Sequence, residues 1–231
     1  MLKDVLIKFA KDLFFPAFCM DCGAEGYFVC QKCFESLQRN TDRAFFRPAE
    51  NTALNGISAV FNYEDRSLPA RLIHAFKYDL IKELEDPLGR IMGEQVSLLI
   101  KNGGEFWKDD PPVLCPVPLH KRREKWRGFN QSRLLARKAA QIAGLEVINP
   151  LVRVHFRSPQ MALDRGDRAR NIEGAFKINT NERALCNFLP FESVFLVDDV
   201  ATTLSTLNEC ALTLKEAGYK KVYAIVLARV A

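Results

Sequence analysis

The chain has 231 residues, of which 48% are hydrophobic and 26% are charged, and it carries a formal net charge of +5. This length and composition allow one substantial core, or a modest core with a small appended module, and they exclude an intrinsically disordered chain as the first expectation. The apolar runs are far shorter than the roughly 20 residues of a membrane-spanning helix, and residues 1–15 carry acids and lack a cleavage-site pattern, so we expect a cytoplasmic protein without membrane insertion.

Hydrophobic periodicity predicts the first elements of the chain. Apolar residues at helical spacing indicate a short amphipathic helix over residues 2–13, and a cysteine-rich segment follows in a module that we expect to end near Asn40. Alternating residues from Ile57 to Tyr63 predict a strand, and two helical stretches follow at 67–78 and 82–102. His74 lies among apolar residues of the first stretch and is expected in the core.

The remainder of the chain alternates between strands and helices. Strands are predicted at 113–117, near 147, at 194–197 and at 222–227, with helices at 130–143 and 204–217 and a basic loop over 153–170. Strands that are separated by helices imply a parallel sheet covered on both faces. We therefore predict an α/β protein in two parts: residues 1–40 form an N-terminal helix and cysteine module, and residues 51–231 form the parallel-sheet domain.

Two Cys-x-x-Cys pairs near the N-terminus carry the strongest chemical signal. Each pair turns two sulfurs toward one point, so four thiolates can close a tetrahedral site that has no open position. We expect a structural zinc ion there, with an iron–sulfur site or a redox dithiol pair as alternatives. The ligands would be Cys19, Cys22, Cys30 and Cys33. The other cysteines lack partners at ligand spacing and are expected to be small buried hydrophobes, namely Cys115, Cys186 and Cys210.

The strand predicted at 194–197 runs into two carboxylates and then into a hydroxyl-rich turn that opens a helix. Ligands of parallel sheets bind at the carboxyl ends of strands, and a helix start offers unpaired N–H groups together with the positive end of its dipole. A phosphate fits on the turn from Thr202 to Thr206. Asp198 and Asp199 are placed to accept hydrogen bonds from ribose hydroxyls, or to approach a magnesium ion through water. Simple capping of the helix is the alternative.

Positive charge gathers in residues 113–183, which hold 15 Lys and Arg against 6 Asp and Glu. Such a segment suits a pyrophosphate or a nucleic-acid backbone, and a solvated basic surface is the alternative. The part that follows the 113–117 strand would lie near the phosphate turn, where Arg122, Arg123 and Arg127 could hold a pyrophosphate. Trp126, among the same cations, is also what single-stranded nucleic acid favours.

Several strings of the chain resemble known families. Residues 194–206 are similar to the phosphoribosyl pyrophosphate signature of type I phosphoribosyltransferases, in which hydrophobic residues precede two acids and then Thr-Thr-Gly-x-Thr. The whole chain resembles the ComF family of competence proteins, on strings that occur in order: the cysteine module, residues 76–78, 116–118, 127–131 and 157–176, and the acidic-pair segment.

This resemblance implies a type I phosphoribosyltransferase-like α/β domain joined to a small N-terminal four-cysteine zinc module. It implies that Asp198 and Asp199 hold a ribose and that magnesium accompanies phosphoribosyl pyrophosphate. It also implies that the basic segment 157–170 closes over the ligand, with Arg168 as a contact to pyrophosphate. The residues that would hold the 5-phosphate are Ala201, Thr202, Thr203, Leu204, Ser205 and Thr206.

One position departs from the family pattern. Leu204 stands where the signature has glycine, which lets the backbone approach a phosphate closely. The leucine is accommodated if its φ is negative and its side chain points into the core. Affinity or catalysis at the turn is expected to suffer from this residue.

Two functions follow as hypotheses. The first is a protein that binds phosphoribosyl pyrophosphate or a related ribose-phosphate and handles single-stranded DNA, together with DNA-uptake proteins, in natural transformation. The second is an active pentosyl transferase, in which cations stabilise the departing pyrophosphate. No residues of the sequence identify a pocket for an acceptor.

Overall fold

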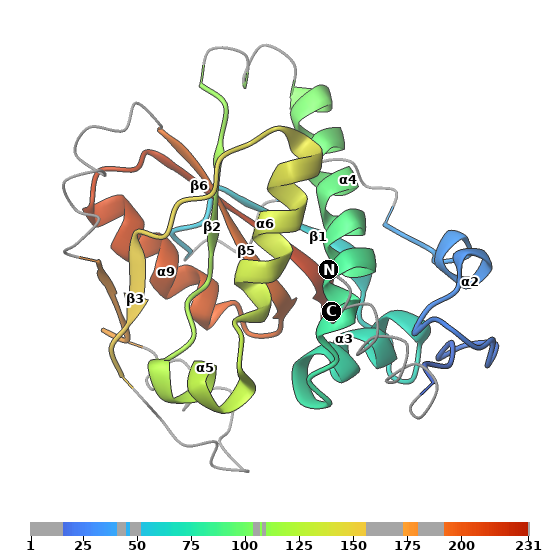
Figure 1. Ribbon diagram of the computed structural model, residues 1–231. Coiled ribbons are helices and arrows are strands. Elements are labelled where there is room, and N and C mark those ends of the chain that lie inside the picture. The colour runs from blue at the N-terminus through green and yellow to red at the C-terminus, as the bar shows by residue number, and fades with distance from the viewer. Residues whose placement is uncertain are drawn as a thin grey trace, which may run out of the picture.

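The computed structural model describes residues 16–40, 45–46, 52–103, 107, 110–155, 173–179 and 192–230. Four predicted features lie outside these residues: the helix over residues 2–13, most of the basic loop, Arg168 and Cys186. Within them, a four-stranded sheet runs through the centre of the molecule (Figure 1), and its strands are all parallel in the order β1-β6-β5-β2. The strands are β1 (Gly56–Asn62), β2 (Val113–Pro116), β5 (Ser193–Ala201) and β6 (Lys221–Arg229).

Apolar helix faces cover the sheet on both sides. One face packs against α3, α4 and α6, and the opposite face packs against α9, so that the buried side chains form two clusters separated by the sheet. Side chains 194–197 of β5 are fully buried, as expected for a parallel strand between two helical layers. The helices are α3 (Leu68–Tyr78), η1 (Lys82–Leu84), α4 (Glu85–Gly103), α6 (Gln131–Ala143) and α9 (Ser205–Glu216). The predicted α/β class with a parallel sheet is confirmed.

Three features of the fold differ from the sequence-based expectations. Residues 121–127, for which no helix or strand was predicted, form the helix α5 (Lys121–Arg127). Arg153, expected at the start of the basic loop, ends β3 (Leu151–Arg153), which pairs antiparallel with β4 (Phe176–Ile178). His74 is not in the core, because its side chain is 62% exposed and its ring contacts Tyr78 at 4.8 Å between centroids.

The cysteine segment packs against the parallel-sheet part of the molecule. It contains one short helix, α2 (Gln31–Glu35), whose Phe34 joins the core cluster on the α4 side of the sheet. The guanidinium groups of Arg39 and Arg90 lie 5.6 and 5.3 Å from the centroid of the Phe34 ring. Asn40 donates its backbone N–H to the carbonyl of Val60 in β1, at 2.8 Å. The division at residues 40 and 51 stays a prediction.

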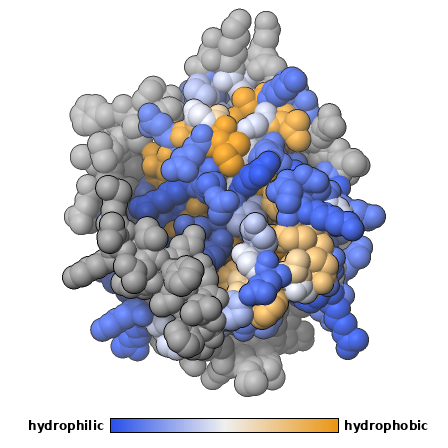
Figure 2. All heavy atoms as spheres, turned by 45° about the vertical axis from the view of Figure 1, so that its right-hand side comes forward, coloured by the Kyte–Doolittle hydropathy of each residue, from blue (hydrophilic) through white to orange (hydrophobic). Residues whose placement is uncertain are grey.

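The surface on the side of α4 and α2 is mostly hydrophilic. Figure 2 brings this side forward and shows hydrophobic side chains gathered in small patches among polar ones. Within the described ranges, every helix is too short or too polar to cross a membrane.

Candidate functional site

The carboxyl ends of β2 and β5 lie side by side, because these two strands pair in parallel. The chain leaves β2 toward α6 on one face of the sheet and leaves β5 toward α9 on the other face. Connections that diverge in this way mark the position where open α/β sheets bind ligands. The acidic pair lies in the last residues of β5, and the phosphate turn and the basic helix α5 follow the ends of β5 and β2.

Asp198 and Asp199 lie within β5, which extends four residues beyond the predicted strand end. Asp198 Oδ1 accepts hydrogen bonds from the Ser132 hydroxyl at 2.8 Å and from the Asp199 backbone N–H at 2.9 Å. Asp199 Oδ1 accepts from the Val200 N–H at 2.7 Å. In the described part of the chain, these contacts leave Oδ2 of each carboxylate to meet a hydroxyl group of a ligand.

Asp198 carries an unfavourable charge at neutral pH. Burial and the neighbouring Asp199 carboxylate raise the pKa of Asp198 to about 6, against the opposing effects of Lys77 and of the Ser132 hydroxyl. Because this pKa is higher in the folded chain than in the unfolded chain, the free energy of unfolding falls as the pH rises from about 4 to about 6.

Asp198→Asn is therefore expected to raise the free energy of unfolding by about 1–2 kcal/mol at neutral pH, and to change it little near pH 4. Asparagine keeps an acceptor oxygen for Ser132 while it removes the buried charge. Urea unfolding at both pH values measures the difference. A substitution that destabilises the protein more at neutral pH than in acid would contradict this description of the site.

Lys77 reaches the acidic pair from the last turn of α3. Its ammonium group lies 2.7 Å from Asp199 Oδ1, and the two side chains are 24% and 6% exposed. Burial alone would lower the pKa of Lys77, but the carboxylates of Asp199 and Asp198 raise it above its ordinary value. The pair is thus a charged contact in a largely buried position. This role of Lys77 was not predicted, although residues 76–78 were among the strings that resemble the family.

Arg127 is a buried cation beside the same carboxylates. Only 9% of the residue is exposed, and its guanidinium lies 5.7 Å from the centroid of the Tyr78 ring. Nη1 donates to Gln131 Oε1 at 3.0 Å, and Gln131 in turn donates to the Phe76 carbonyl at 3.4 Å. Burial lowers the pKa of Arg127, and the Asp199 carboxylate opposes this effect. Nε of Arg127 is buried without a hydrogen-bond partner among the described residues, so the group can still donate to a ligand.

The residues after Arg127 hold the basic helix against the site. Gly128 ends α5 in the left-handed region at φ +80°, which explains why a glycine stands there. The Phe129 ring packs on Phe76 with centroids 5.6 Å apart. Asn130 caps α6 through a bond from the Arg133 N–H and also donates to the carbonyl of Val117. Two strings that are far apart in sequence, residues 76–78 and 127–131, therefore pack against each other next to the acidic pair.

The three arginines that were predicted to act together occupy different environments on α5. Arg127 is buried and close enough to Asp199 for the two charges to interact, Arg123 is partly buried, and Arg122 is exposed. Arg153 on β3 lies close enough to Arg123 and Asp198 for their charges to affect its pKa, which burial lowers. Arg153 was not among the predicted site residues because it lay at the start of a predicted loop. Trp126 points outward on α5 and is 68% exposed.

The predicted phosphate turn connects β5 to α9. Ala201 ends the strand, and α9 begins at Ser205, whose hydroxyl lies 3.0 Å from the Thr203 hydroxyl. Leu204 precedes the helix at φ +60°, in the left-handed region, while its side chain packs against the α9 core cluster. Of the two conditions for accommodating Leu204, the side chain does pack against the core, but φ is not negative. Leucine adopts the backbone geometry that glycine adopts without strain, at a cost of about 1–2 kcal/mol.

The free energy of unfolding of Leu204→Gly is expected to exceed that of Leu204→Ala by about 1 kcal/mol. Both substitutions remove the same packing, but only glycine relieves the strain of the positive φ. Urea unfolding of Leu204→Gly and Leu204→Ala measures this order. Leu212, exposed in the middle of α9, is the matched control. At Leu212 the order should be reversed, since glycine weakens a helix interior by about 0.5–1 kcal/mol. If the alanine variant were more stable than the glycine variant at both positions, the result would contradict a strained backbone at Leu204.

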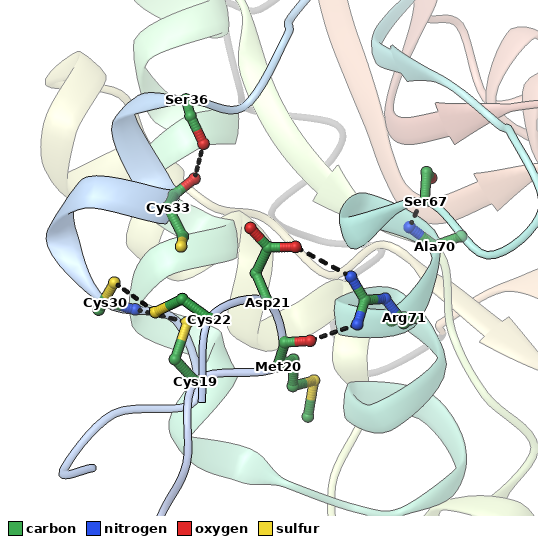
Figure 3. Close-up of polar contacts among 10 residues, drawn as sticks. All are labelled: Cys19, Met20, Asp21, Cys22, Cys30, Cys33, Ser36, Ser67, Ala70 and Arg71. Atoms are coloured by element: carbon green, nitrogen blue, oxygen red, sulfur yellow. Dashed lines mark hydrogen bonds and ion pairs between the residues drawn. The ribbon is translucent and has the colours of Figure 1, made fainter. Parts of the chain in front are cut away.

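The four predicted cysteine ligands come together at one point (Figure 3). Their sulfur atoms all lie within 4.8 Å of one another. A tetrahedral zinc ion with bonds of about 2.3 Å places its sulfurs about 3.8 Å apart, so the cluster fits this ion. Gly23, at φ +75°, turns the chain after the first pair, and Cys30 starts the helix that carries Cys33. Burial raises the pKa of the Cys19 thiol, but backbone N–H groups of Cys22 and Cys30 lower it to about 6, whereas burial and the neighbouring cysteines raise the pKa of the Cys33 thiol.

One side chain links the cysteine cluster to α3. Arg71 donates from Nη2 to Asp21 Oδ1 at 3.1 Å and from Nη1 to the Met20 carbonyl, both inside the first Cys-x-x-Cys pair (Figure 3). The same helix carries Lys77 at its other end. Cys115 and Cys210 lie fully buried in the α9 cluster, as predicted.

The fold and the site define a class: an α/β protein with an acidic pair and buried cations at the strand ends, joined to a four-cysteine module. Comparison with known proteins agrees. Competence protein F of Haemophilus influenzae is 36% identical over 120 residues, which are 52% of this chain and 51% of that protein. DNA utilization protein YhgH of Salmonella typhimurium is 31% identical over 159 residues, which are 68% of this chain and 66% of that protein.

Competence protein ComFC of Bacillus subtilis is 34% identical over 114 residues, which are 49% of this chain and 42% of that protein. The chain belongs to the ComF family. Its matched regions span between 42% and 66% of the length of these relatives. No family model matches the chain.

Proposed function

We propose that the chain binds phosphoribosyl pyrophosphate or a related ribose-phosphate at the carboxyl end of β5. The convergence of the acidic pair with Lys77 and Arg127 carries this proposal. Carboxylate oxygens accept hydrogen bonds from a sugar diol, whereas a buried guanidinium with an unused donor suits a phosphate group. No similar combination of acceptors and buried cations lies elsewhere in the described residues.

The turn at 201–206 would hold the 5-phosphate of the ligand. Leu204 precedes α9 without a side-chain hydrogen bond to the helix, so no side chain of this residue occupies the first backbone N–H groups, which a phosphate could accept from. Arg127 and Arg123 would meet a pyrophosphate, and a magnesium ion would accompany that group and offset part of its negative charge. Pentosyl transfer to an acceptor stays a prediction.

We also propose that the chain handles single-stranded DNA during DNA uptake. The names of its relatives in Haemophilus influenzae, Bacillus subtilis and Salmonella typhimurium refer to competence or DNA utilization. The outer face of α5 supports the proposal, since it combines exposed cations with an exposed aromatic ring. These residues are Lys121, Arg122, Lys125 and Trp126. Such surfaces bind the backbone through charge and the bases through stacking.

Replacing Arg122 and Lys125 by alanine is expected to weaken binding of a short oligothymidylate about tenfold at low salt, and to reduce the steepness of its salt dependence. Trp126→Ala should weaken binding without changing that slope, because stacking releases no counterions. Fluorescence anisotropy over a salt series measures both effects. Lys101→Ala, at the far end of α4, is the control. If both α5 variants bound the oligothymidylate as tightly as the wild type, the outer face of α5 would not be the DNA-binding surface.

The cysteine cluster would hold zinc as a structural ion. All four positions of a tetrahedral site are taken by sulfur, which leaves none for a substrate. The ion would stabilise residues 16–40, which have few buried side chains of their own.

A further inference from the structure

Lys77 supplies a positive charge to the acidic pair, which a pair of carboxylates that bound magnesium directly would not require. Asp199 is almost completely buried, and its Oδ1 already accepts from the Lys77 ammonium and from the Val200 N–H, both at 2.7 Å. Oδ1 of Asp198 likewise accepts from Ser132 and from the backbone. Both carboxylates are therefore held in place before any ligand arrives.

A magnesium ion coordinated directly by this pair does not fit these contacts. Magnesium requires oxygen ligands at about 2.1 Å in octahedral geometry, and it would share Asp199 with an ammonium group of the same sign of charge. Arg127 adds a second buried positive charge beside Asp199. Lys77 thus already pairs with Asp199, and the charge of Arg127 acts on the same carboxylate, within the described residues.

We propose that Lys77 takes the place of a divalent cation at the acidic pair, so that the sugar-phosphate part of the ligand binds without magnesium. This inference rests on the proposed ribose-phosphate site and adds its ion requirement. Lys77 neutralises Asp199 and orients it, and the remaining oxygens of the pair accept from a vicinal diol. Any magnesium requirement of the full ligand then comes from the pyrophosphate group alone.

The charge and the hydrogen bond of Lys77 can be separated by two conservative substitutions. Lys77→Gln keeps a donor for Asp199 and removes the charge, whereas Lys77→Arg keeps both. Lys220→Gln is a matched control, because Lys220 forms an exposed ion pair with Glu192 outside the site. The probe is ribose 5-phosphate, which contains the diol and the 5-phosphate but no pyrophosphate. It is titrated by calorimetry into the full chain with excess magnesium, and again with EDTA.

The wild type, Lys77→Arg and Lys220→Gln are expected to bind ribose 5-phosphate with dissociation constants that agree within about twofold in the two buffers. Lys77→Gln is expected to bind about tenfold more weakly in EDTA and to recover affinity in magnesium, since the uncompensated carboxylate then accepts the ion. The glutamine variant would show a new magnesium dependence, which a merely structural role of Lys77 would not produce.

Wild-type binding that disappears in EDTA would overturn the inference and leave the ribose-phosphate site intact. Equal affinity of Lys77→Gln in both buffers would also overturn it. Wild-type protein that binds no ribose 5-phosphate in either buffer would contradict the proposed site itself, and the inference with it. If Lys77→Gln does not fold, as judged by circular dichroism, the wild-type and Lys77→Arg titrations still decide the question.

Discussion

Cys30→Ser is expected to release the metal ion and to unfold residues 16–40. Serine cannot supply the fourth thiolate, and structural zinc ions contribute about 10–16 kcal/mol to the folding of small modules. The effect should spread beyond the cysteines, because Phe34 contributes to the core on the α4 side and Arg71 bonds to the first Cys-x-x-Cys pair. We therefore expect a lower melting temperature for the whole chain.

Inductively coupled plasma mass spectrometry measures the metal content, and circular dichroism measures the melting temperature. Lys32→Ser is the control, because Lys32 is exposed and lies between Cys30 and Cys33 without being a ligand. It should retain about one zinc per chain. Iron in place of zinc would favour the iron–sulfur alternative, and full zinc content in Cys30→Ser would show that the four-cysteine assignment is wrong.

Arg127→Met is expected to weaken the binding of phosphoribosyl pyrophosphate at least 30-fold, that is by about 2 kcal/mol or more. The guanidinium is buried next to Asp199, holds Gln131 at 3.0 Å and retains an unused donor. A buried charge-assisted bond contributes far more than an exposed one, because water competes little with it. Methionine fills a similar volume, so the loss should be one of ligand affinity more than of folding.

Two arginines provide matched controls for Arg127. Arg122 is on the same helix but is exposed, and Arg133 is on α6, where it pairs with Glu124 at 2.6 Å. Their methionine variants should change the affinity for phosphoribosyl pyrophosphate by less than about threefold, because exposed or partly exposed pairs contribute little. Arg122 should matter instead for DNA. Equal losses in all three variants would mean that long-range charge, and not a contact of Arg127, attracts the ligand.

The elements that could be predicted from sequence are those with a strong apolar pattern. The buried residues of β5 and β6 and the apolar faces of α6 and α9 are visible in one sequence, because burial on two faces or on one stripe dictates the residue types. The strand predicted near Val147 is not formed, and a single parallel bridge to Leu114 stands in its place. The four cysteines were predictable because metal geometry restricts their spacing.

The elements that were missed have no such pattern. Helix α5 has the sequence KRREKWR, with no apolar stripe, and it is defined by its ends: His120 accepts from the Arg122 N–H, and Gly128 ends the helix. The strands β3 and β4 have three residues each, too few to show alternation. His74 was placed in the core because its neighbours are apolar, but it lies on the solvent side of α3.

Some residues of the candidate site could likewise be predicted from the sequence, and others could not. The acidic pair and the turn are contiguous in sequence, so their chemistry could be predicted from one segment. Lys77 is 122 positions from Asp199, and only the packing of α3 against the sheet brings them together. The unexpected φ of Leu204 also comes from tertiary structure, because the turn must leave β5 and enter α9 on one face of the sheet.

The most direct test of the ribose-phosphate site is a calorimetric titration of phosphoribosyl pyrophosphate with magnesium into the wild type and into Asp198→Asn/Asp199→Asn. Asparagine retains the shape of each side chain, so the double variant should stay folded, which circular dichroism checks. We predict that the wild type binds and that the double variant binds at least about 100-fold more weakly, because both acceptors for the ribose diol lose their charge. Wild-type protein that does not bind the compound, or a double variant that binds it equally well, would contradict the site.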